Sequence, residues 1–251
     1  MSMKCSRFYQ ASNLRVGGEL ALSDINHRHA IQVLRLKLND SLIIFNGDGG
    51  EYLARFISVE KRNSRIVLES FDSINRDSSL HSTLFLAMIK PDKMDFAIQK
   101  IVELGVTEIQ PMYTKRSVIK IKANRLEKKM LHWQGVIIAA CEQSGRTTIP
   151  IIREPKTIIE CLSLQVSDNF FVMLPGNHGA ITQLHRSKTP ISNISLLIGP
   201  EGGFTSDEEQ LIQNKGVTAI SFGKRILRAE TAAISGLTAC QLLWGDLSLS
   251  Q

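Results

Sequence analysis

The stretch Ile194–Glu209, ISLLIGPEGGFTSDEE, determines how the C-terminal part of this chain is interpreted. It begins with a continuous apolar run, typical of a buried strand, and ends with residues typical of a helix start. Gly-Pro-Glu-Gly-Gly stands between them, at 199–203. Glycines between a strand and a helix allow a ligand to approach the backbone closely. The stretch therefore predicts a strand, a ligand-binding turn and a helix in direct succession.

The same alternation of strand and helix extends over residues 73–251. We expect strands at 83–89, 107–113, 149–152, 169–176, 194–199 and 217–223, and helices at 91–106, 124–144, 156–164, 206–215 and 229–244. Asp92 is the expected cap of the first helix, and Ser206 with Glu209 has the spacing of a capping box. Continuous apolar strands between helices indicate an α/β fold with a mostly parallel sheet covered on both faces.

The N-terminal residues 1–72 have a different pattern, of short strands separated by turns. Residues 41–60 read as a hairpin around the turn NGDGG. A short helix is expected at 24–36, with an apolar face made by Ile25, Ala30, Ile31, Val33 and Leu34. The polar stretch that starts at 72 predicts a domain boundary, giving a domain 1–72 and a domain 73–251.

Three of the expected strands end in loops that could form one site: 173–179 (MLPGNHG), 198–203 (IGPEGG) and 222–231 (FGKRILRAET). Ligands of parallel sheets bind at the carboxyl ends of the strands. If these strands are neighbours, the three loops line one pocket. In the last loop, Arg228 and Glu230 could simply pair with each other, or Arg228 could hold an anionic group at the pocket mouth.

Composition restricts the function classes. The formal net charge is +6, and residues 115–129 carry seven basic side chains against one acid, which suits a polyanionic partner although a solvated helix face explains such a run equally simply. No apolar run could span a bilayer, and the polar N-terminus lacks a signal-peptide core. The four cysteines have no metal-binding spacing, so we expect reduced thiols, a cytoplasmic location and no metal. Hydrolase motifs and the P-loop lysine are missing.

Several motifs taken together resemble one family. PDKMDFAIQKIVELGV (91–106), EQSGR (142–146), LLIGPEGGFTSDE (196–208) and FGKRILRAETA (222–232) occur in this order in the RsmE family of SPOUT-class methyltransferases, and RFY (7–9) with HAIQVLRLKLND (29–40) resembles its N-terminal domain. The resemblance covers nearly the whole chain. It implies a PUA-like RNA-binding β-barrel, then a SPOUT domain with a C-terminal trefoil knot that binds S-adenosylmethionine. It also implies a homodimer that methylates N3 of a uridine in 16S ribosomal RNA of the small subunit.

The resemblance also implies site residues. The cofactor would lie between three walls, formed by Leu174, Pro175 and Gly176, by Ile198, Gly199, Pro200, Glu201, Gly202 and Gly203, and by Ile226, Leu227, Arg228 and Ala229. Side chains at the glycines of the second wall would obstruct adenine. Arg7, Arg35, Lys115, Arg116 and Arg146 would contact RNA, although Arg146 could instead lie beside the last carbonyls of a helix.

Methyl transfer to uracil N3 requires loss of the N3 proton. A nearby cation favours the N3 anion, and we assign this role to Arg228. Glu201 or Glu230 is the proton acceptor, and the sequence leaves the choice between them open. Two other functions remain open at this stage. A ribosome-assembly factor could bind RNA with a degenerate cofactor pocket, and a nucleotide hydrolase is a weaker reading because the P-loop lysine is missing.

Overall fold

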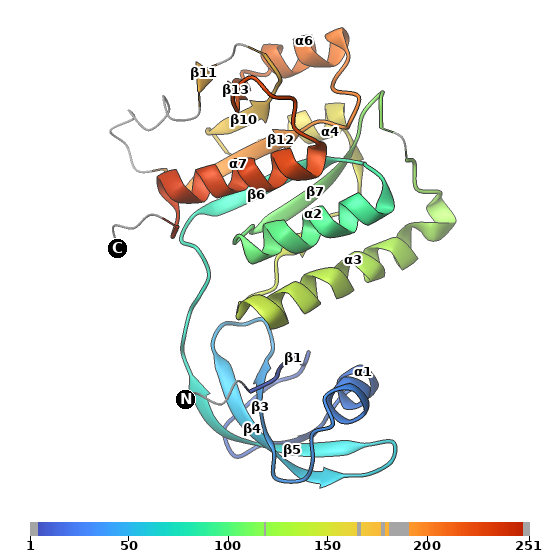
Figure 1. Ribbon diagram of the computed structural model, residues 1–251, viewed down its shortest axis with the longest axis vertical. Coiled ribbons are helices and arrows are strands. Elements are labelled where there is room, and N and C mark those ends of the chain that lie inside the picture. The colour runs from blue at the N-terminus through green and yellow to red at the C-terminus, as the bar shows by residue number, and fades with distance from the viewer. Residues whose placement is uncertain (1–4, 118, 165–166, 177–178, 181–190, 248–251) are drawn as a thin grey trace. The chain divides into compact units, whose positions relative to one another are not determined.

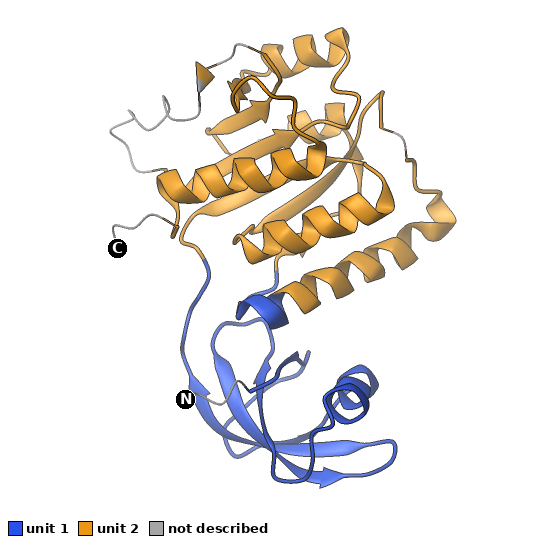
Figure 2. Cartoon of the chain, viewed as in Figure 1, with its two compact units in different colours: residues 1–77, 141–149 blue, residues 78–140, 150–251 orange. Residues whose placement is uncertain are grey.

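The computed structural model describes residues 5–117, 119–164, 167–176, 179–180 and 191–247, so most of the segment GNHGAITQLHRSKTP (176–190) lies outside the described residues. The chain divides into two compact units (Figures 1 and 2). Unit 1 comprises 1–77 and 141–149, and unit 2 comprises 78–140 and 150–251. The division falls five residues after the expected boundary at 72, and a second segment from the end of a long helix belongs to unit 1.

Unit 1 is built on one five-stranded sheet in the order β1-β3-β4-β5-β2. Its strands are β1 (Arg7–Tyr9), β2 (Glu19–Ala21), β3 (Ser41–Phe45), β4 (Glu51–Val59) and β5 (Ser64–Asp72). β1 and β3 are parallel and the other pairs are antiparallel, with the predicted hairpin formed by β3 and β4. The core contains Phe8, Leu22, Ala30, Leu42, Ile44, Ala54, Phe56, Ile66 and Leu68.

The predicted helix at 24–36 forms differently from the expectation. It consists of α1 (Asp24–His27) and a π-helical segment, η1 (Arg28–Val33), in which Leu34 N donates to His29 O. The wider turn of a π-helix changes which side chains share a face. Ile25, in α1, is 72% exposed and Val33 is 67% exposed, whereas Ala30 is fully buried and Ile31 packs against the core. The predicted apolar face is confirmed at Ala30 and Ile31 and wrong at Ile25, Val33 and Leu34.

Unit 1 also contains a network of arginines and carboxylates around the segment 141–149. Arg7 pairs with Glu51, and Arg76 Nη1 lies 3.1 Å from the same carboxylate. Arg76 Nη1 also donates to Gly145 O at 3.0 Å, and Arg7 Nη2 donates to Arg146 O at 2.9 Å. These two carbonyls follow the end of a long helix, so Arg7 of β1 and Arg76, which follows β5, satisfy acceptors that the helix itself leaves open.

Unit 2 is built on a parallel sheet in the order β11-β13-β10-β12-β6-β7-β8, with β9 beside β7. The strands are β6 (His81–Ala87), β7 (Glu108–Tyr113), β8 (Ile151–Ile152), β9 (Lys156–Thr157), β10 (Phe170–Met173), β11 (Gly179–Ala180), β12 (Asn193–Ile198) and β13 (Thr218–Ser221). Every pairing between these described strands is parallel, as the continuous apolar runs predicted.

Helices cover both faces of this sheet (Figure 1). They are α2 (Pro91–Glu103), α3 (Ala123–Ser144), α4 (Ile158–Ser163), α6 (Ser206–Asn214) and α7 (Ala229–Trp244). On one face, side chains of α4 and α6 pack on Phe85, Met112, Val172 and Leu197 of the strands. α2 and α7 contact each other, and α7 also contacts β6 and β12. The expected apolar face of α2 is confirmed, because Met94, Ala97, Ile98, Ile101 and Val102 are its buried residues.

Two helix starts differ from the predicted ones by one or two positions. Lys90 is the N-cap of α2 and makes no side-chain capping bond, so Asp92 lies within the first turn instead of capping it. The capping box of α6 is formed by Thr205 and Glu208, one residue before the predicted pair Ser206 and Glu209. Thr205 has the extended backbone that an N-cap requires, which moves the box by one residue.

Glycine ends the long helix α3 as the sequence predicted. Gly145 follows α3 with a φ of +86°, a conformation that strongly favours glycine. All four cysteines are free, and burial raises the pKa of Cys141, Cys161 and Cys240 to about 12. These three thiols are therefore packing groups at neutral pH. None of the described helices is long and apolar enough to cross a membrane.

Candidate functional site

The three loops that the sequence singled out come together at one edge of the parallel sheet. β10 pairs with β12 on one side and with β13 on the other, so the three strands are neighbours. Parallel neighbours place their carboxyl ends at the same edge. The loops after β10, β12 and β13 therefore line one cavity, and the expectation from the sequence is confirmed.

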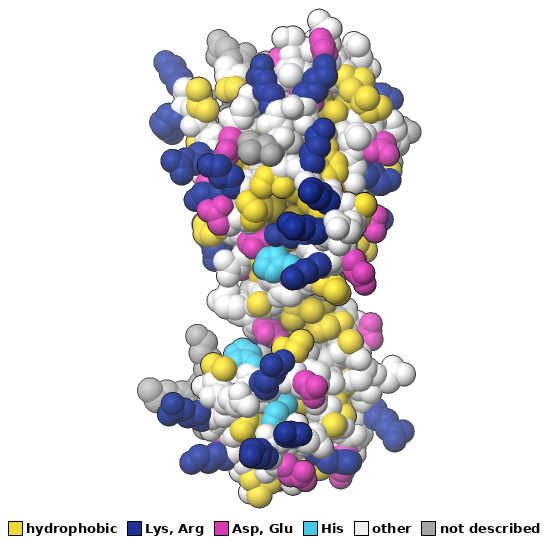
Figure 3. All heavy atoms as spheres, turned by 90° about the vertical axis from the view of Figure 1, so that its right-hand side faces the viewer, with side chains coloured by type: hydrophobic (Ala, Val, Ile, Leu, Met, Phe, Trp, Pro, Cys, Tyr) yellow, Lys and Arg dark blue, Asp and Glu magenta, His cyan; other side chains and the backbone are white. Residues whose placement is uncertain are grey.

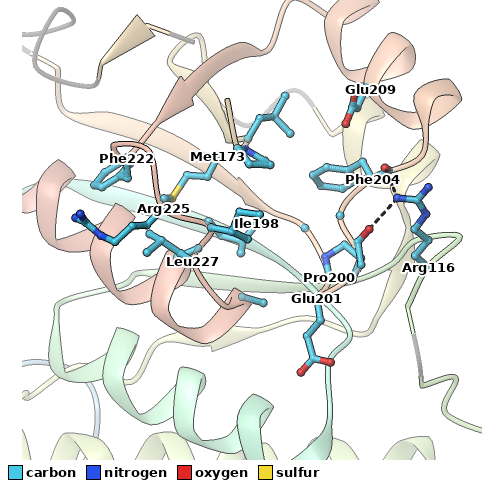
Figure 4. Close-up of a pocket in the computed structure, with 18 of the residues that line it drawn as sticks. Arg116, Met173, Ile198, Pro200, Glu201, Phe204, Glu209, Phe222, Arg225 and Leu227 are labelled. Carbon is cyan, nitrogen blue, oxygen red and sulfur yellow. Dashed lines mark hydrogen bonds between the residues drawn. The ribbon is translucent and has the colours of Figure 1, made fainter. Parts of the chain in front are cut away.

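This cavity has a volume of about 330 Å³, at the lower end of the range for small-molecule sites. Met173, Ile198 and Leu227 form its apolar centre, and Phe204 and Phe222 stand at opposite sides (Figure 4). Arg225 and Glu209 lie at its margin, so charged groups surround an apolar slot. The lining residues are Arg116, Met173, Leu174, Pro175, Ile198, Gly199, Pro200, Glu201, Gly202, Gly203, Phe204, Glu209, Phe222, Gly223, Arg225, Ile226, Leu227, Ala229 and Ala232.

Most residues of the three expected walls line this cavity; Gly176 and Arg228 do not. Gly176 is exposed after the end of β10. Arg228 is the N-cap residue of α7, with an extended backbone and an exposed side chain. Its two neighbours, Leu227 and Ala229, both line the cavity. Arg228 therefore stands at the rim of the cavity.

Several lining residues were missed by the sequence reading. Met173 and Phe222 are the first residues of the predicted loops 173–179 and 222–231 but were not assigned to a wall, and Ala232 is one helical turn beyond Ala229. Those three follow from the local pattern. Phe204 could have been inferred as the apolar residue after the glycines, whereas Arg116 comes from a distant loop and has no local signal.

The glycines of the second wall differ in what a side chain at each position would meet. A Cβ at Gly199 would lie 2.8 Å from the Phe204 ring, so packing within the protein already excludes a side chain there. A Cβ at Gly202 would meet the aliphatic part of Arg116 at 3.4 Å, an ordinary contact. Gly203 has free space but a φ of +69°. Internal packing therefore accounts for Gly199 and backbone conformation for Gly203, whereas Gly202 leaves room for a side chain.

Two basic residues after β7 hold the glycine loop in place. Arg116 Nη1 donates to Gly202 O at 2.8 Å and to Phe204 O at 3.1 Å (Figure 4). The backbone N–H of Lys115 donates to Glu208 Oε1 at 2.7 Å, while the other oxygen of Glu208 accepts from Thr205 N at 2.9 Å. Buried Glu208 thus joins the capping box of α6 to the β7 loop. Both segments are fixed before any ligand binds.

The two candidate proton acceptors have different surroundings. Glu201 lines the cavity, and its exposed carboxylate points away from Phe204 and Leu227 (Figure 4). Glu230 is buried in the first turn of α7 and outside the cavity lining. Its Oε1 lies 3.9 Å from Lys93 Nζ, and its Oε2 has no hydrogen-bond partner among the described residues. The structure does not pair Arg228 with Glu230 within salt-bridge distance in this part of the chain.

Some of the predicted RNA-binding residues are exposed, and others are held by contacts within the protein. Arg35 is exposed, at a φ of +57°. Lys115 Nζ pairs with exposed Asp207 at 2.7 Å, and that contact raises the pKa of Lys115. The side chain of Arg7 is 13% exposed, and burial, then Arg76, lowers its pKa. Arg146 is buried, and its Nε donates to Asp77 Oδ1 at 2.6 Å. Most of these cations already have protein partners.

No metal-binding site is found in the part of the chain that the structure describes. No group of three or more His, Cys, Asp or Glu side chains there could hold a metal ion.

Comparison with known proteins extends over the whole chain. The RNA methyltransferase domain model matches residues 76–241, and the RNA methyltransferase PUA domain model matches residues 23–69. Ribosomal RNA small subunit methyltransferase E of Buchnera aphidicola subsp. Acyrthosiphon pisum is 35% identical over 246 residues, which is 97% of this chain and 95% of the relative. The second model lies within unit 1 and the first mostly within unit 2.

Solved structures show the same fold. A Legionella pneumophila methyltransferase structure in complex with the bound cofactor SAM is similar with a TM-score of 0.93 and 34% identity, over 98% of this chain and 100% of that chain. Ribosomal RNA small subunit methyltransferase E from Neisseria gonorrhoeae, bound to S-adenosyl methionine, gives a TM-score of 0.89 and 37% identity, over 97% and 100%. With the cavity at the ends of β10, β12 and β13, these similarities show that the chain belongs to the ribosomal RNA small subunit methyltransferase E family.

Proposed function

We propose that this chain transfers the methyl group of S-adenosylmethionine to N3 of a uridine in 16S ribosomal RNA of the small subunit. The observation that carries the proposal is the cavity between the carboxyl ends of three neighbouring parallel strands. Two family members with the same fold, at 34% and 37% identity, were solved with the cofactor bound. Membership of the family supports cofactor-dependent methylation of small-subunit RNA. The proposal adds that the methylated atom is N3 of a uridine.

The residues of the cavity suit S-adenosylmethionine. Met173, Ile198 and Leu227 offer apolar surface to a flat adenine, and glycine-rich backbone offers polar groups without side-chain bulk. Arg225 and Glu209 at the margin can pair with the carboxylate and ammonium of the methionine part. We assign cofactor binding to the lining residues, with Gly176 and Arg228 contributing at the rim.

The bound cofactor supplies an electrophilic methyl group, so the chain has to favour the N3 anion of the uracil. Arg228 stands beside the cavity between two lining residues, where its cation would stabilise a developing negative charge. Its exposure leaves it free to meet a base that enters from solvent. We therefore keep Arg228 as the residue that lowers the pKa of N3.

Of the two candidate acceptors, the geometry favours Glu201 for the N3 proton. Glu201 lines the cavity, and its exposed carboxylate, which points away from Leu227 in Figure 4, can rotate toward an entering base, whereas Glu230 is buried beside Lys93 and outside the lining. A general base needs to reach the proton that it removes. We therefore propose Glu201 as the acceptor and Glu230 as a positioning residue that holds the start of α7 through Lys93.

RNA contact divides among the predicted residues by whether the side chain is tied to a backbone carbonyl or a buried partner, as in Arg7, Arg116 and Arg146, or has at most an exposed partner, as in Lys115. Direct phosphate contact suits exposed Arg35 and Lys115. Arg7, Arg116 and Arg146 donate to protein acceptors, so we propose that they act by holding the segments that present the RNA-binding surface. The target base lies in folded RNA and would have to leave its stack to reach the cavity.

Three further properties belong to the same proposal. A trefoil knot is supported by the strand order, in which β13 lies between β10 and β11 and the chain then returns through α7 across β12 and β6. A homodimer and a cytoplasmic location are expected from the family resemblance and from a ribosomal substrate.

The first test is calorimetric titration with S-adenosylmethionine, with ATP as the control ligand. We expect saturable binding near one cofactor per chain and none for ATP. Methyl transfer is then measured on small subunits lacking the modification, and mass spectrometry of the isolated nucleoside identifies the methylated atom. Binding without transfer to any small subunit would favour an RNA-binding assembly factor with a residual cofactor pocket.

The role of Arg228 is tested by Arg228→Ala beside Arg228→Lys. We expect the alanine variant to lose about 10²–10³-fold in the rate of methyl transfer with cofactor affinity retained, the size seen when one charge-stabilising donor is removed. The lysine variant should recover part of the rate, and higher pH should rescue the alanine variant because N3 then ionises unaided. Near-normal turnover of Arg228→Ala would remove Arg228 from the mechanism.

A further inference from the structure

A second cavity of about 280 Å³ lies in unit 2, outside the cofactor cavity. Its apolar residues come from the segment after β6, from the start of α2, from the segment between β7 and α3, and from α3 itself: Met88, Ile89, Pro91, Met94, Ile119, Ile121 and Trp133. Its basic residues are Lys120, Lys122, Arg125 and Lys129. On the face of unit 2 shown in Figure 3, hydrophobic side chains gather between Lys and Arg side chains. We call this the Trp133 cavity.

The indole of Trp133 is an unsatisfied donor in the wall of this cavity. Trp133 is completely buried, and its Nε1–H has no hydrogen-bond partner among the described residues. Buried donors without an acceptor are rare in folded proteins, because each loses its bond to water. Lys129 Nζ lies 5.0 Å above the indole ring and 3.2 Å from Asp95 Oδ1, so the ring is held in place. The Nε1–H has almost no accessible surface in this structure, so a ligand acceptor reaches it only if the side chains that cover the indole shift.

Apart from Lys129, the basic residues of the Trp133 cavity have no side-chain partner among the described residues. The exposed side chains of Lys120, Lys122 and Arg125 make no hydrogen bond or ion pair with any other described residue. Lys115 and Arg116, from the same basic run, both have protein partners. The three unpaired cations thus surround an apolar cavity, which differs from a charge run spread over a solvated helix face.

The position of these cations is unfavourable unless an anion is present. Lys122 directly precedes α3 and Arg125 lies in its first turn, which has no acidic residue. The start of a helix carries a partial positive charge, so cations there destabilise it and anions stabilise it. An anion bound by Lys122 and Arg125 would remove this repulsion. A ligand with both a planar apolar part and negative charge would fill the apolar cavity and pair with the cations at its rim.

The Trp133 cavity lies on the same edge of the sheet as the cofactor cavity. Met88 and Ile89 follow the carboxyl end of β6, and residues 119–122 follow β7. β6 is hydrogen-bonded to β12, with Ile198 opposite Leu86. The ends of β12 and β7 are two strand spacings apart, roughly 10 Å. One RNA strand running along this edge could reach both cavities.

We propose that the Trp133 cavity binds a nucleobase of the substrate RNA next to the methylated nucleotide. The base enters the apolar cavity, the side chains that cover the indole shift so that the base accepts a hydrogen bond from Trp133 Nε1, and Lys120, Lys122 and Arg125 hold the adjoining phosphates. The proposal rests on the proposed function, because it assumes an RNA substrate. In this proposal the unpaired cations of the basic run bind RNA phosphates, and the Nε1–H of Trp133, which has no partner in the structure, donates to the base.

Two variants test the contacts. Trp133→Phe keeps an aromatic ring and removes the donor, and Lys120→Ala/Lys122→Ala/Arg125→Ala removes the three cations. The control, Lys100→Ala/Arg153→Ala/Lys215→Ala, changes the net charge of unit 2 equally at residues outside both cavities. Binding to small subunits lacking the modification is measured over a range of salt concentrations. Cofactor binding by each variant is measured in parallel.

We expect Trp133→Phe to weaken subunit binding about 3- to 10-fold, the value of one hydrogen bond. The triple variant should lower the salt slope by roughly two units, at about 0.7 per single-strand phosphate contact, and the control by much less. Cofactor affinity should stay unchanged. Equal salt slopes for the triple variant and its control, with normal binding by Trp133→Phe, would overturn the proposal.

A fluorescence measurement separates this proposal from the proposed function. In a Trp244→Phe background Trp133 is the remaining tryptophan, so single-stranded oligoribonucleotides that stack near it should change its emission. This readout needs no methyl transfer, and an inactive chain could still give it. No change in emission at saturating RNA would count against the cavity. A changed oligomeric state of Trp133→Phe without RNA would assign the cavity to a second copy of the chain and also overturn the proposal.

Discussion

The two units of this chain use basic residues in opposite ways. In unit 1, Arg7 and Arg76 meet Glu51, and buried Arg146 meets Asp77. In unit 2, Lys120, Lys122 and Arg125 line an apolar cavity and form no side-chain pair with another described residue. The sequence shows basic residues in both places. Only burial distinguishes cations that hold the fold from cations that are available to a ligand.

The difference follows from the two architectures. Unit 1 is a small sheet joined by a second segment, 141–149, and its arginines satisfy the carbonyls of that segment. Unit 2 has a long parallel sheet with apolar strands and helices on both faces, so its core is apolar. Its ion pairs, such as Lys115 with Asp207, lie outside that core, and the cations around the Trp133 cavity are not needed to hold it.

The largest expected effect that sharpens this comparison comes from Arg146→Ala in unit 1. The change leaves Asp77 without its partner in a buried position, and we expect unit 1 to lose about 3–5 kcal/mol of stability. Hydrogen exchange of the strands β3 to β5 measures the loss. Arg153→Ala is the matched control, because Arg153 pairs with Glu108 while half exposed and should cost about 0–1 kcal/mol. Equal losses for the two variants would break the comparison.

The next effect concerns the glycine loop of unit 2. Gly199→Ala pushes against the Phe204 ring, and we expect a loss of about 1–3 kcal/mol in stability together with weaker cofactor binding, since Phe204 lines the cavity. Gly202→Ala meets Arg116 at an ordinary distance and should change stability by less than about 0.5 kcal/mol. Urea denaturation and calorimetry on both variants measure the two quantities. A loss at Gly202 as large as at Gly199 would contradict the packing explanation.

A third prediction compares a buried and an exposed contact of the same β7 loop. Glu208→Ala removes the capping box of α6 and the acceptor of Lys115 N, and we expect a loss of about 1 kcal/mol. Lys115→Ala removes only the exposed pair with Asp207 and should leave stability nearly unchanged, because water screens that pair. Thermal unfolding of both variants gives the ranking. A larger loss for Lys115→Ala would show that the exposed pair holds the loop.

The smallest effect depends on pH. Burial raises the pKa of Glu142, although the Tyr9 N–H donates to its Oε1 at 2.9 Å. A raised pKa means that the folded state prefers the protonated form of Glu142. The stability that Glu142 contributes is therefore greatest below the pKa of the unfolded state and is lost as pH rises through the pKa of the folded state. Glu142→Gln keeps the acceptor without the charge. It should stabilise unit 1 slightly at pH 7 and leave it unchanged near pH 4.

The control for this pH effect is Glu60→Gln, because Glu60 is an exposed carboxylate of unit 1. Unfolding free energies at the two pH values are compared for both variants. A gain at pH 7 for Glu60→Gln as large as for Glu142→Gln would mean that the general reduction of negative charge is responsible. Burial of Glu142 would then have no measurable consequence.

The sequence by itself determined the elements of unit 2 and the loops of its cofactor cavity. Strand and helix patterns are local, and Gly145 marks a helix end by a conformation that few other residues adopt. The glycines after Ile198 likewise marked the site, because a strand end with such freedom suits a ligand. Most residues of the three expected walls therefore line the cavity.

Only the tertiary structure decided which side chains are buried and which distant segments meet. Arg116, from the basic run, reaches the glycine loop from another strand end, and Arg146, which follows a helix end, is buried against Asp77. The π-helical turn at 28–33 and the unsatisfied indole of Trp133 likewise depend on packing. The physical reason is that burial and strand order are set by long-range contacts, and a local pattern does not contain them.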